Sequence, residues 1–464
     1  MPKIGLEIHG YLVTNEKLFC SCKALHGSKN SKPNTNICPI CTGQPGAKPL
    51  LPNKTAINNA IKIGLLLNCN INQRLVWQRK HYDWPDLPKG YQNTISGTYA
   101  IPNATKGEFE EIRITELHLE EDPAAWNPKT GEIDYNRSGT PLIEIVTEPD
   151  FKSSEQVIEW IKKLLTTLGY IDVINKKAGI KADVNISLPE NKGERVEIKN
   201  VNSIKNIKKA IEYEIKRQSS SKEEIPKIQE TRMFDETKGI TKLMRTKEQA
   251  QDYRFIAEPD LPTLKINKER INKLKKDIPE TPKQKLDKLI NQYKLDKKAA
   301  EILTKRLEIV EFFEKIIENK KIDKKIATQW VLVELLSVLN YNQKELSDID
   351  LKSEHFIELL ELLQDKKITE LKAKDLLRSW KEKSYSPKEK AKDFGKISEN
   401  EIKELTKKVI QENPKAVSDY KAGQEKSINF LIGQIMRLSE KRADFKTSKE
   451  NLEEELKRIV YKDK

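Results

Sequence analysis

The sequence lacks several patterns that mark large classes of proteins. No apolar run approaches the ~18 residues that a membrane-spanning helix needs, and the start, MPKIGLEIHG, shows no charged-then-apolar signal pattern. We therefore expect a cytoplasmic protein with no membrane association. The motifs GxxxxGK[ST] and GxSxG are absent, and no GxGxxG follows a strand-like run. These absences exclude a P-loop, leave a Rossmann site unsupported and offer no acyl-transfer nucleophile.

Charge is abundant, and its balance is basic. The 464 residues include 85 Lys+Arg against 71 Asp+Glu, for a formal net charge of +14. Such an excess favours a polyanionic partner such as nucleic acid, although a Lys-rich composition can also simply solvate helices. The length predicts two or three domains. Hydrophobic residues make up 37% of the chain and recur with clear periods, which excludes wholesale disorder.

Cysteine is scarce, but its spacing is informative. Four of the five cysteines, Cys20, Cys22, Cys38 and Cys41, form Cys-X-Cys and Cys-X-X-Cys pairs separated by 15 residues. Two such pairs can place four thiolates around one Zn²⁺. A disulfide framework is the alternative, and it fits a cytosolic chain poorly. We expect a closed structural zinc site without chemistry of its own, and in Cys69 an inert core thiol.

The hydrophobic patterns predict an α+β protein. Period-two alternation predicts strands in KIGLEIHGYL, EEIRITELHLEED and PLIEIVTE, and further strands in ADVNISL and RVEIKNV. Helices are predicted at 54–67, in SSEQVIEWIKKLLTTLG, where Ser153 and Gln156 form a capping-box signature, and in SIKNIKKAIEYEIKRQ. SSSKEE (219–224) is predicted to be an exposed loop. From Lys265 onward the strand signal disappears and the pattern is helical.

Acidic residues recur at positions that an active site can use. Alternation places Glu7 with His9 on one face, and Glu120 with His118 on one face, while Glu121 points to the other face unless the strand has ended there. A third predicted strand carries Glu144 and Glu148. Carboxylates and an imidazole suit Mg²⁺ or Mn²⁺, or an acid–base pair. The alternative for each segment is an ordinary strand with a solvated face, and spacing alone does not show that the strands meet.

Three loop-like segments are rich in polar groups suited to binding. KHYDWPDLPKGYQ combines aromatic residues, Pro and Lys, and DYNRSGTP carries Arg137 beside turn residues. VEIKNVNS places Lys199, Asn200 and Asn202 just before a predicted helix, which suits a phosphate contact. The alternative for this last segment is a helix cap formed by Asn202 or Ser203.

Motifs spread over the whole chain resemble one known family. They are GLEIH (5–9), KLFCSC (17–22), PNTNICPIC (33–41), PDLPKGYQ (85–92), HLEED (118–122), DYNRSGTPLIEIVTEPD (134–150), VEIKNVNS (196–203), QETRMFD (229–235), MRTKEQAQDYRFIAEPDLP (244–262) and NPKAVSDYKAGQEKSINFLIGQIMR (413–437). With these motifs in family order, the chain resembles the B subunits of aspartyl/glutamyl-tRNA(Asn/Gln) amidotransferases, the GatB family.

The resemblance implies a fold and an activity. It implies a catalytic cradle domain at 1–290 with the zinc knuckle at 20–41, a helical domain at 291–397 and a helical tRNA-binding tail at 398–464. The family uses ATP and Mg²⁺ to phosphorylate the side-chain carboxylate of Asp-tRNA(Asn) or Glu-tRNA(Gln). Ammonia from an amidase (glutaminase) partner then displaces phosphate, and a small third subunit usually clasps the pair.

The resemblance also implies roles for individual residues. By motif position, His9, Glu121 and Glu144 are the implied Mg²⁺ ligands, and Glu7 and Glu120 are implied at a second metal or an ammonia path. The implied contacts to ATP or the tRNA end are Lys80, Tyr82, Lys89, Tyr91, Arg137, Lys199 and Asn200. The implied contacts to the tRNA backbone are Lys421, Lys426, Arg437, Lys441 and Arg442.

The chain departs from the family pattern beside the proposed site. Gly10 and Tyr11 replace the usual Val-Gln, Pro-Ala-Ala-Trp follows HLEED where Gly and a basic residue are usual, and Lys181-Ala182 replaces Arg-Cys. These changes leave open a non-catalytic, zinc-containing tRNA-binding scaffold. The acidic cluster alone also allows a metal-dependent phosphohydrolase that acts on nucleic acid. Because the carboxylates and His9 are intact, we expect activity to be retained.

Overall fold

The computed structural model describes residues 1–25, 31–175, 178–246, 254–389, 391–424 and 426–462. The segment KEQAQDY, part of the quoted motif at 244–262, lies outside these residues. The chain separates into two compact units, Met1–Pro282 and Lys283–Lys464. None of the described helices has the length and apolarity to cross a membrane. One unit combines a large sheet with helices and the other is helical, so the predicted α+β class is confirmed, whereas the three-domain layout stays a prediction.

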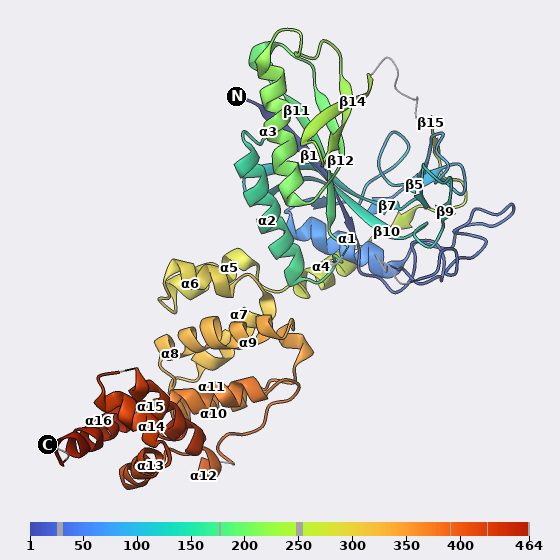
Figure 1. Cartoon of the computed structure of the whole chain (residues 1–464). Coiled ribbons are helices and arrows are strands. Elements are labelled where there is room, and N and C mark those ends of the chain that lie inside the picture. The colour runs from blue at the N-terminus through green and yellow to red at the C-terminus, as the bar shows by residue number, and fades with distance from the viewer. Residues whose placement is uncertain (26–30, 176–177, 247–253, 390, 425, 463–464) are drawn as a thin grey trace. The chain divides into compact units, whose positions relative to one another are not determined.

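One 12-stranded sheet dominates the N-terminal unit (Figure 1), in the order β14-β13-β12-β11-β1-β10-β7-β5-β4-β15, with β6 beside β7 and β2 beside β6. The strands of this sheet are β1 Lys3–Tyr11, β2 Asn70–Ile71, β4 Gln78–His81, β5 Gln92–Thr94, β6 Ala104–Phe109, β7 Ile112–Glu121, β10 Pro141–Thr147, β11 Ile180–Ser187, β12 Val196–Asn202, β13 Glu230–Asp235, β14 Ile240–Thr246 and β15 Arg254–Ala257. Two small ladders pair β3 Arg74–Leu75 with β16 Leu264–Lys265, and β8 Ala125–Trp126 with β9 Ile133–Asp134.

Helices cover one face of this sheet and leave the other to polar side chains. Helices α2 (Ser154–Tyr170) and α3 (Ile204–Ser220) lie side by side on the covered face (Figure 1), and α1 (Lys54–Leu66) packs against β6 and β7. In β1, Ile4, Leu6 and Ile8 are at most 2% exposed and join the core cluster. The intervening residues, including His9, therefore face the side without helices, as the period-two alternation predicts.

Local signals explain where these helices begin. The side chain of Asn53 caps α1, Ser153 caps α2 and Ser203 caps α3, each by accepting a backbone N–H of the first turn. The Ser153–Gln156 capping box forms only in part, because the Gln156 side chain accepts from the backbone N–H of Lys152 instead. At the other end, α3 continues to Ser220, so the predicted loop at 219–224 begins within a helix.

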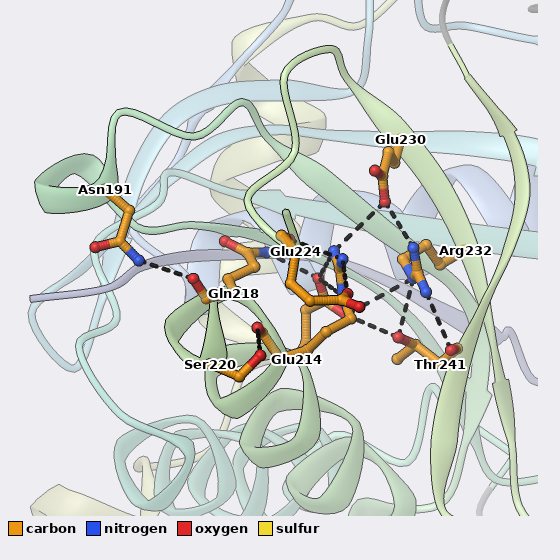
Figure 2. A network of polar contacts seen from close by, with 9 residues as sticks. Asn191, Glu214, Gln218, Ser220, Glu224, Glu230, Arg232 and Thr241 are labelled. Carbon is orange, nitrogen blue, oxygen red and sulfur yellow. Dashed lines mark hydrogen bonds and ion pairs between the residues drawn. The ribbon is translucent and has the colours of Figure 1, made fainter. Parts of the chain in front are cut away.

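Strands β13 and β14 have no counterpart in the sequence predictions. They form an antiparallel hairpin at one end of the sheet, and β13 runs parallel to β12. A buried polar network fastens the hairpin to α3 (Figure 2): Glu214, 0% exposed, accepts from Arg217, from Gln218 and from the hydroxyl of Thr241 in β14. Arg232 of β13 donates to the same hydroxyl at 3.0 Å. One carboxylate therefore joins a helix to both strands of the hairpin.

The C-terminal unit contains only helices besides one isolated bridge, among its described residues. Helix α4 (Lys268–Lys276) still belongs to the N-terminal unit. The helices that follow it are α5 Pro282–Asn291, α6 Lys297–Leu303, α7 Leu307–Glu318, α8 Lys324–Gln329, the π-helical turn η3 Trp330–Leu335, α9 Leu336–Tyr341, α10 Ser353–Gln364, α11 Glu370–Ser379, α12 Ala391–Phe394, α13 Glu399–Glu412, α14 Pro414–Lys421, α15 Ser427–Leu438 and α16 Phe445–Lys462. Helices α13 to α16 share a hydrophobic cluster that includes Ile402, Leu431 and Leu452.

The buried network makes a prediction about stability. Replacing Glu214 by Ala removes one counter-charge from the guanidinium groups of Arg217 and Arg232 in a buried place, and should lower the free energy of unfolding by about 3–5 kcal/mol. Equilibrium denaturation by urea measures the change. The matched control is Glu212→Ala on the same helix, whose side chain is 50% exposed; it should cost less than about 1 kcal/mol. Equal losses in the two variants would contradict the role assigned to Glu214.

Candidate functional site

The register of three strands brings the predicted acids together. In the antiparallel pairs β1–β10 and β10–β7, His9 lies opposite Glu144, and Glu144 lies opposite His118. Glu144 Oε2 is 3.2 Å from His9 Nε2 and 3.1 Å from His118 Nε2. Glu120 Oε1 is 3.5 Å from the same nitrogen of His118. The three strands, whose acids the sequence predicted separately, therefore bring these residues into one group.

This group suits a divalent cation. One donor atom each from His9, Glu120 and Glu144 lies within 4.8 Å of the others, and two carboxylates with one imidazole match Mg²⁺ or Mn²⁺. His118, which received no site role from the sequence, is 3% exposed and lies 3.0 Å from Glu116 through its other nitrogen. It holds Glu144 from behind, in the way that supporting groups orient metal ligands.

Burial and pairing compete in this group, and pairing prevails. Burial by itself lowers the pKa of His9, but the carboxylates of Glu144, Asp183 and Glu120 raise it to about 9. The same contest raises the pKa of His118 well above its usual value. For Glu144, burial favours the neutral acid, yet the two imidazoles hold its pKa well below the usual range. With these protonation states the group is a set of charged partners inside the protein. Only a neutral imidazole binds a metal, so a cation that binds here would displace the proton of His9.

Glu121 lies elsewhere in the structure. Its carboxylate forms an ion pair with Lys89 and accepts the backbone N–H of Asn93 at 2.8 Å. Glu120, one residue earlier, shares the face of His118, as strand alternation predicts. The structure thus brings Glu120, and not Glu121, together with His9 and Glu144, whereas the family resemblance favours Glu121. Glu121 instead positions Lys89, which stays a candidate for phosphate binding.

A second acidic group lies next to the first on the same face. One carboxylate oxygen each from Glu7, Asp183 and Glu197 lies within 4.8 Å of the others, and Glu7 pairs with Asp183 across β1 and β11. Lys199 Nζ is 2.8 Å from both Asp183 and Glu197, and the backbone N–H of Asn200 donates to Asp183 at 2.7 Å. The predicted phosphate contacts of Lys199 and Asn200 therefore compete with these carboxylates. Burial and the neighbouring carboxylates raise the pKa of Glu7.

Basic and aromatic residues from β4 and the following loop lie near the acids. Lys80 on β4 pairs with Gln92 of β5. Burial alone would raise the pKa of Glu120, but the hydrogen bond with His118 and the charges of His118 and Lys80 together lower it below its usual value. Lys89 Nζ lies 5.1 Å from the ring centroid of Tyr91. Tyr82 lies between β4 and β5 and is half-buried.

Arg79 is a charged residue of this region that the sequence did not single out. Its guanidinium forms two 2.8 Å bonds to Glu258 and a 3.0 Å bond to Asp260, and it lies 4.3 Å from the ring centroid of Tyr91. Glu258 and Asp260 belong to the EPDLP end of a motif noted above, so Arg79 ties that motif to Tyr91. The acids of this motif were the signal in the sequence that could have pointed to Arg79, because a buried carboxylate such as that of Glu258 needs a positively charged partner.

Two of the departures from the family pattern, Tyr11 and the segment after Asp122, meet at Asp122. The hydroxyl of Tyr11 donates to Asp122 at 2.7 Å, and Arg137 Nε lies 3.1 Å from the same oxygen. Arg137 also donates to the carbonyls of Pro123 and Ala124 at 2.9 and 2.6 Å. Tyr11 and the Pro-Ala-Ala-Trp segment thus form one bonded unit with Arg137. Arg137, which was predicted to contact ATP or the tRNA end, therefore uses much of its hydrogen-bonding capacity on partners within the chain.

The four clustered cysteines fit a zinc ion. The Sγ atoms of Cys20, Cys22, Cys38 and Cys41 all lie within 4.8 Å of one another, and all four are free thiols. Four ligands at 2.3 Å in a tetrahedron have sulfurs about 3.8 Å apart, and the Cys38–Cys41 separation is 3.8 Å. A hydrogen bond with Cys20 and the charge of Lys17 help to lower the pKa of Cys41 to about 4, against the effect of burial. A hydrogen bond with Cys41 and burial raise the pKa of Cys20, and burial raises that of Cys22 to about 11, so the fit to zinc rests on the positions of the four sulfur atoms.

The predicted tRNA-backbone cations fall into two groups. Lys421, Lys426 and Arg437 are exposed. Lys441 forms an ion pair with Asp375 at 2.6 Å, and Arg442 donates to the carbonyl of Gly395 at 2.9 Å. The latter two are half-buried and fasten α15 and its following turn to the segments before it.

Comparison with known proteins assigns the chain to a class. Residues 2–272 match the family model described as the GatB/GatE catalytic domain, and residues 311–456 match that described as the GatB domain. The chain therefore belongs to the GatB family of amidotransferase B subunits, which makes it one component of a carbon–nitrogen ligase.

Individual relatives match nearly end to end. The B subunit of the aspartyl/glutamyl-tRNA(Asn/Gln) amidotransferase of Methanobrevibacter smithii is 43% identical, over 97% of this chain and 99% of the relative. The B subunits of the same name from Methanocaldococcus jannaschii and Methanopyrus kandleri are 42% and 41% identical, each over 98% of both chains. The resemblance noted in the sequence is therefore confirmed.

The zinc site makes a prediction about metal content. Replacing Cys38 by Ser removes one of four ligands and should cost about one equivalent of zinc per chain, because three thiolates leave the tetrahedron open. Elemental analysis of the purified protein measures it. The matched control is Cys69→Ser, which changes a buried thiol outside the cluster and should leave the zinc content as it was. Unchanged zinc in the Cys38 variant would reject the site.

Proposed function

We propose that the chain activates tRNA mischarged with Asp or Glu. In this proposal it binds Asp-tRNA(Asn), Glu-tRNA(Gln) or both, and transfers the terminal phosphate of ATP to the side-chain carboxylate. Ammonia released from glutamine by an amidase partner then replaces the phosphate, and a small third protein of the complex holds the two large subunits together. Membership of the GatB family supports this activity, and the observation that carries it is the convergence of His9, Glu120 and Glu144.

The chemistry explains why such a site needs charge and no nucleophile. A carboxylate is a poor acyl donor, because the leaving group would be oxide. Phosphorylation converts that oxygen into a good leaving group, and phosphoryl transfer depends mainly on placement and on neutralising negative charge. Mg²⁺ held by His9, Glu120 and Glu144 would supply that neutralisation. The absence of a GxSxG motif therefore fits the proposal.

Residues around the metal group have complementary tasks. Lys80 and Lys89 add positive charge beside the acids, where ATP phosphates would bind. Burial and neighbouring acids raise the pKa of Glu7. Its carboxylate is therefore a stronger base than an ordinary glutamate, and it is the candidate acceptor for the proton of incoming ammonium. Lys199 partly neutralises the second acidic group and keeps Asp183 and Glu197 together. Arg137 orients the chain after Asp122.

The C-terminal unit is the proposed contact to the tRNA backbone. Lys421, Lys426 and Arg437 are exposed, and contacts of this kind are independent of sequence and weaken with salt. Lys441 and Arg442, which form bonds within the chain, are proposed to shape this surface. The zinc is proposed to be structural, and the complex to act in the cytoplasm.

Reconstitution tests the proposed function directly. The chain is combined with the amidase and the small third protein, ATP, glutamine and each mischarged tRNA, and the amino acid on the tRNA is then analysed. Conversion of Asp to Asn or of Glu to Gln is expected, with ATP hydrolysis that depends on the mischarged tRNA. A scaffold would bind tRNA without such hydrolysis, and a phosphohydrolase would cut tRNA without ATP. Either outcome would overturn the proposal.

The ligand assignment makes a sharper prediction. Glu144→Gln should abolish formation of the aminoacyl phosphate and spare tRNA binding, because it removes the carboxylate shared by both imidazoles. Glu120→Gln and Glu121→Gln form a matched pair, since the residues are adjacent but only Glu120 lies with His9 and Glu144. Mn²⁺ titration should show at least about tenfold weaker binding for the Glu120 variant and a smaller change for the Glu121 variant. The reverse order would return Glu121 to the ligand set.

A further inference from the structure

A buried lysine lies against the zinc site. Lys17 is 1% exposed, and it is among the largest fully buried side chains of the described chain. Its Nζ donates to the carbonyl of Asn36 at 3.1 Å and to that of Tyr135 at 3.3 Å, and it lies 3.4 Å from Cys41 Sγ. Lysine is almost never fully buried without a charged partner, so this position requires an explanation.

Lys17 lacks the usual charged partner within the part of the chain that the structure describes. Among the residues that the structure describes, no carboxylate forms an ion pair with Lys17. Two carbonyls satisfy N–H groups but provide no negative charge, and an uncompensated buried ammonium costs several kcal/mol. The sulfur of Cys41 is the third partner, and it supplies a negative charge only when Cys41 is a thiolate.

The cysteine cluster supplies the missing charge when it holds zinc. Four thiolates and one Zn²⁺ carry a net charge of −2, which is itself unfavourable away from water. An ammonium in contact with one of the sulfurs offsets part of that charge and donates an N–H···S hydrogen bond. The positive charge of Lys17 and the negative charge of the zinc cluster are each unfavourable when buried alone, and each is stabilised by the other.

We propose that Lys17 is the counter-charge of the zinc site and a positioning residue for its Cys41 thiolate. Its second task is to join the knuckle to the loop at 134–140, through the carbonyl of Tyr135. The same loop is held by Ser138, which donates to the Cys41 carbonyl at 2.8 Å, and by Asn136, which accepts from the backbone of Asn36 at 2.8 Å. This inference concerns metal retention and does not depend on the proposed function.

Zinc release tests the proposal on the full chain. Lys17→Met and Lys17→Gln remove the charge, and Gln keeps N–H groups that can reach carbonyls. Both variants should release zinc to a chromogenic chelator about tenfold faster than the wild type, as loss of a supporting residue typically weakens a metal site by 10–100-fold. Alkylation of the knuckle cysteines should accelerate in parallel. The control is Lys23→Met, the same change at a knuckle lysine that is exposed, and it should leave both rates unchanged.

A double-mutant cycle separates charge compensation from simple packing. Cys22→His converts the site to three thiolates and one imidazole, a common zinc ligand set whose net charge is −1. Because less negative charge then needs an offset, Lys17→Met should accelerate zinc release by a clearly smaller factor in the Cys22→His background. Equal factors in both backgrounds would show that Lys17 only fills space, and would overturn the proposal.

The remaining outcomes are equally decisive. Zinc release and alkylation at wild-type rates in both Lys17 variants would overturn the proposal outright. If Lys17→Met does not fold, Lys17→Gln and the cycle built on it replace it. Failure of the reconstituted amidation reaction would leave these measurements unaffected, so the two hypotheses can fail separately.

Discussion

The candidate active site depends on the antiparallel register of β1, β10 and β7. Because His9 lies opposite Glu144 and Glu144 opposite His118, one buried carboxylate is shared by two imidazoles. Burial opposes each of these charges, and their charged forms persist because they are paired. A slip of one residue in either pairing would turn the whole set toward the helix-covered face, so the register of the sheet is also the specification of the site.

The zinc knuckle and the acidic face are linked by one short loop. Arg137 in the middle of this loop binds Asp122, the residue that follows the strand carrying Glu120. On either side of Arg137, the Ser138 hydroxyl binds the Cys41 carbonyl and the Tyr135 carbonyl accepts from Lys17, which ties the loop to the knuckle. The mostly polar knuckle has little core of its own, and metal coordination is a physical substitute for such a core. A structural metal therefore has a direct route of influence on the position of Arg137.

Much of the fold follows from local patterns. Alternation predicted β1, β7 and β10 and placed His9 and Glu120 on their correct faces, because a strand repeats every two residues. The hairpin of β13 and β14 was missed, since its inner face is held to α3 by the polar network of Glu214 and not by alternating apolar residues. The break between α13 and α14 lies at Asn413–Pro414, because proline cannot continue the first helix.

Patterns along the chain were enough to identify the family, the α+β class, the four zinc-type cysteines and the residue types of the active face. The folded structure was needed to show that the acidic strands meet, and that Glu120 lies with His9 and Glu144 while Glu121 pairs with Lys89. It also decided which cations are already paired, as Lys441 is with Asp375. The physical reason is the same in each case. These contacts join residues far apart in the chain, and their geometry comes from register and packing, which spacing along the sequence does not record.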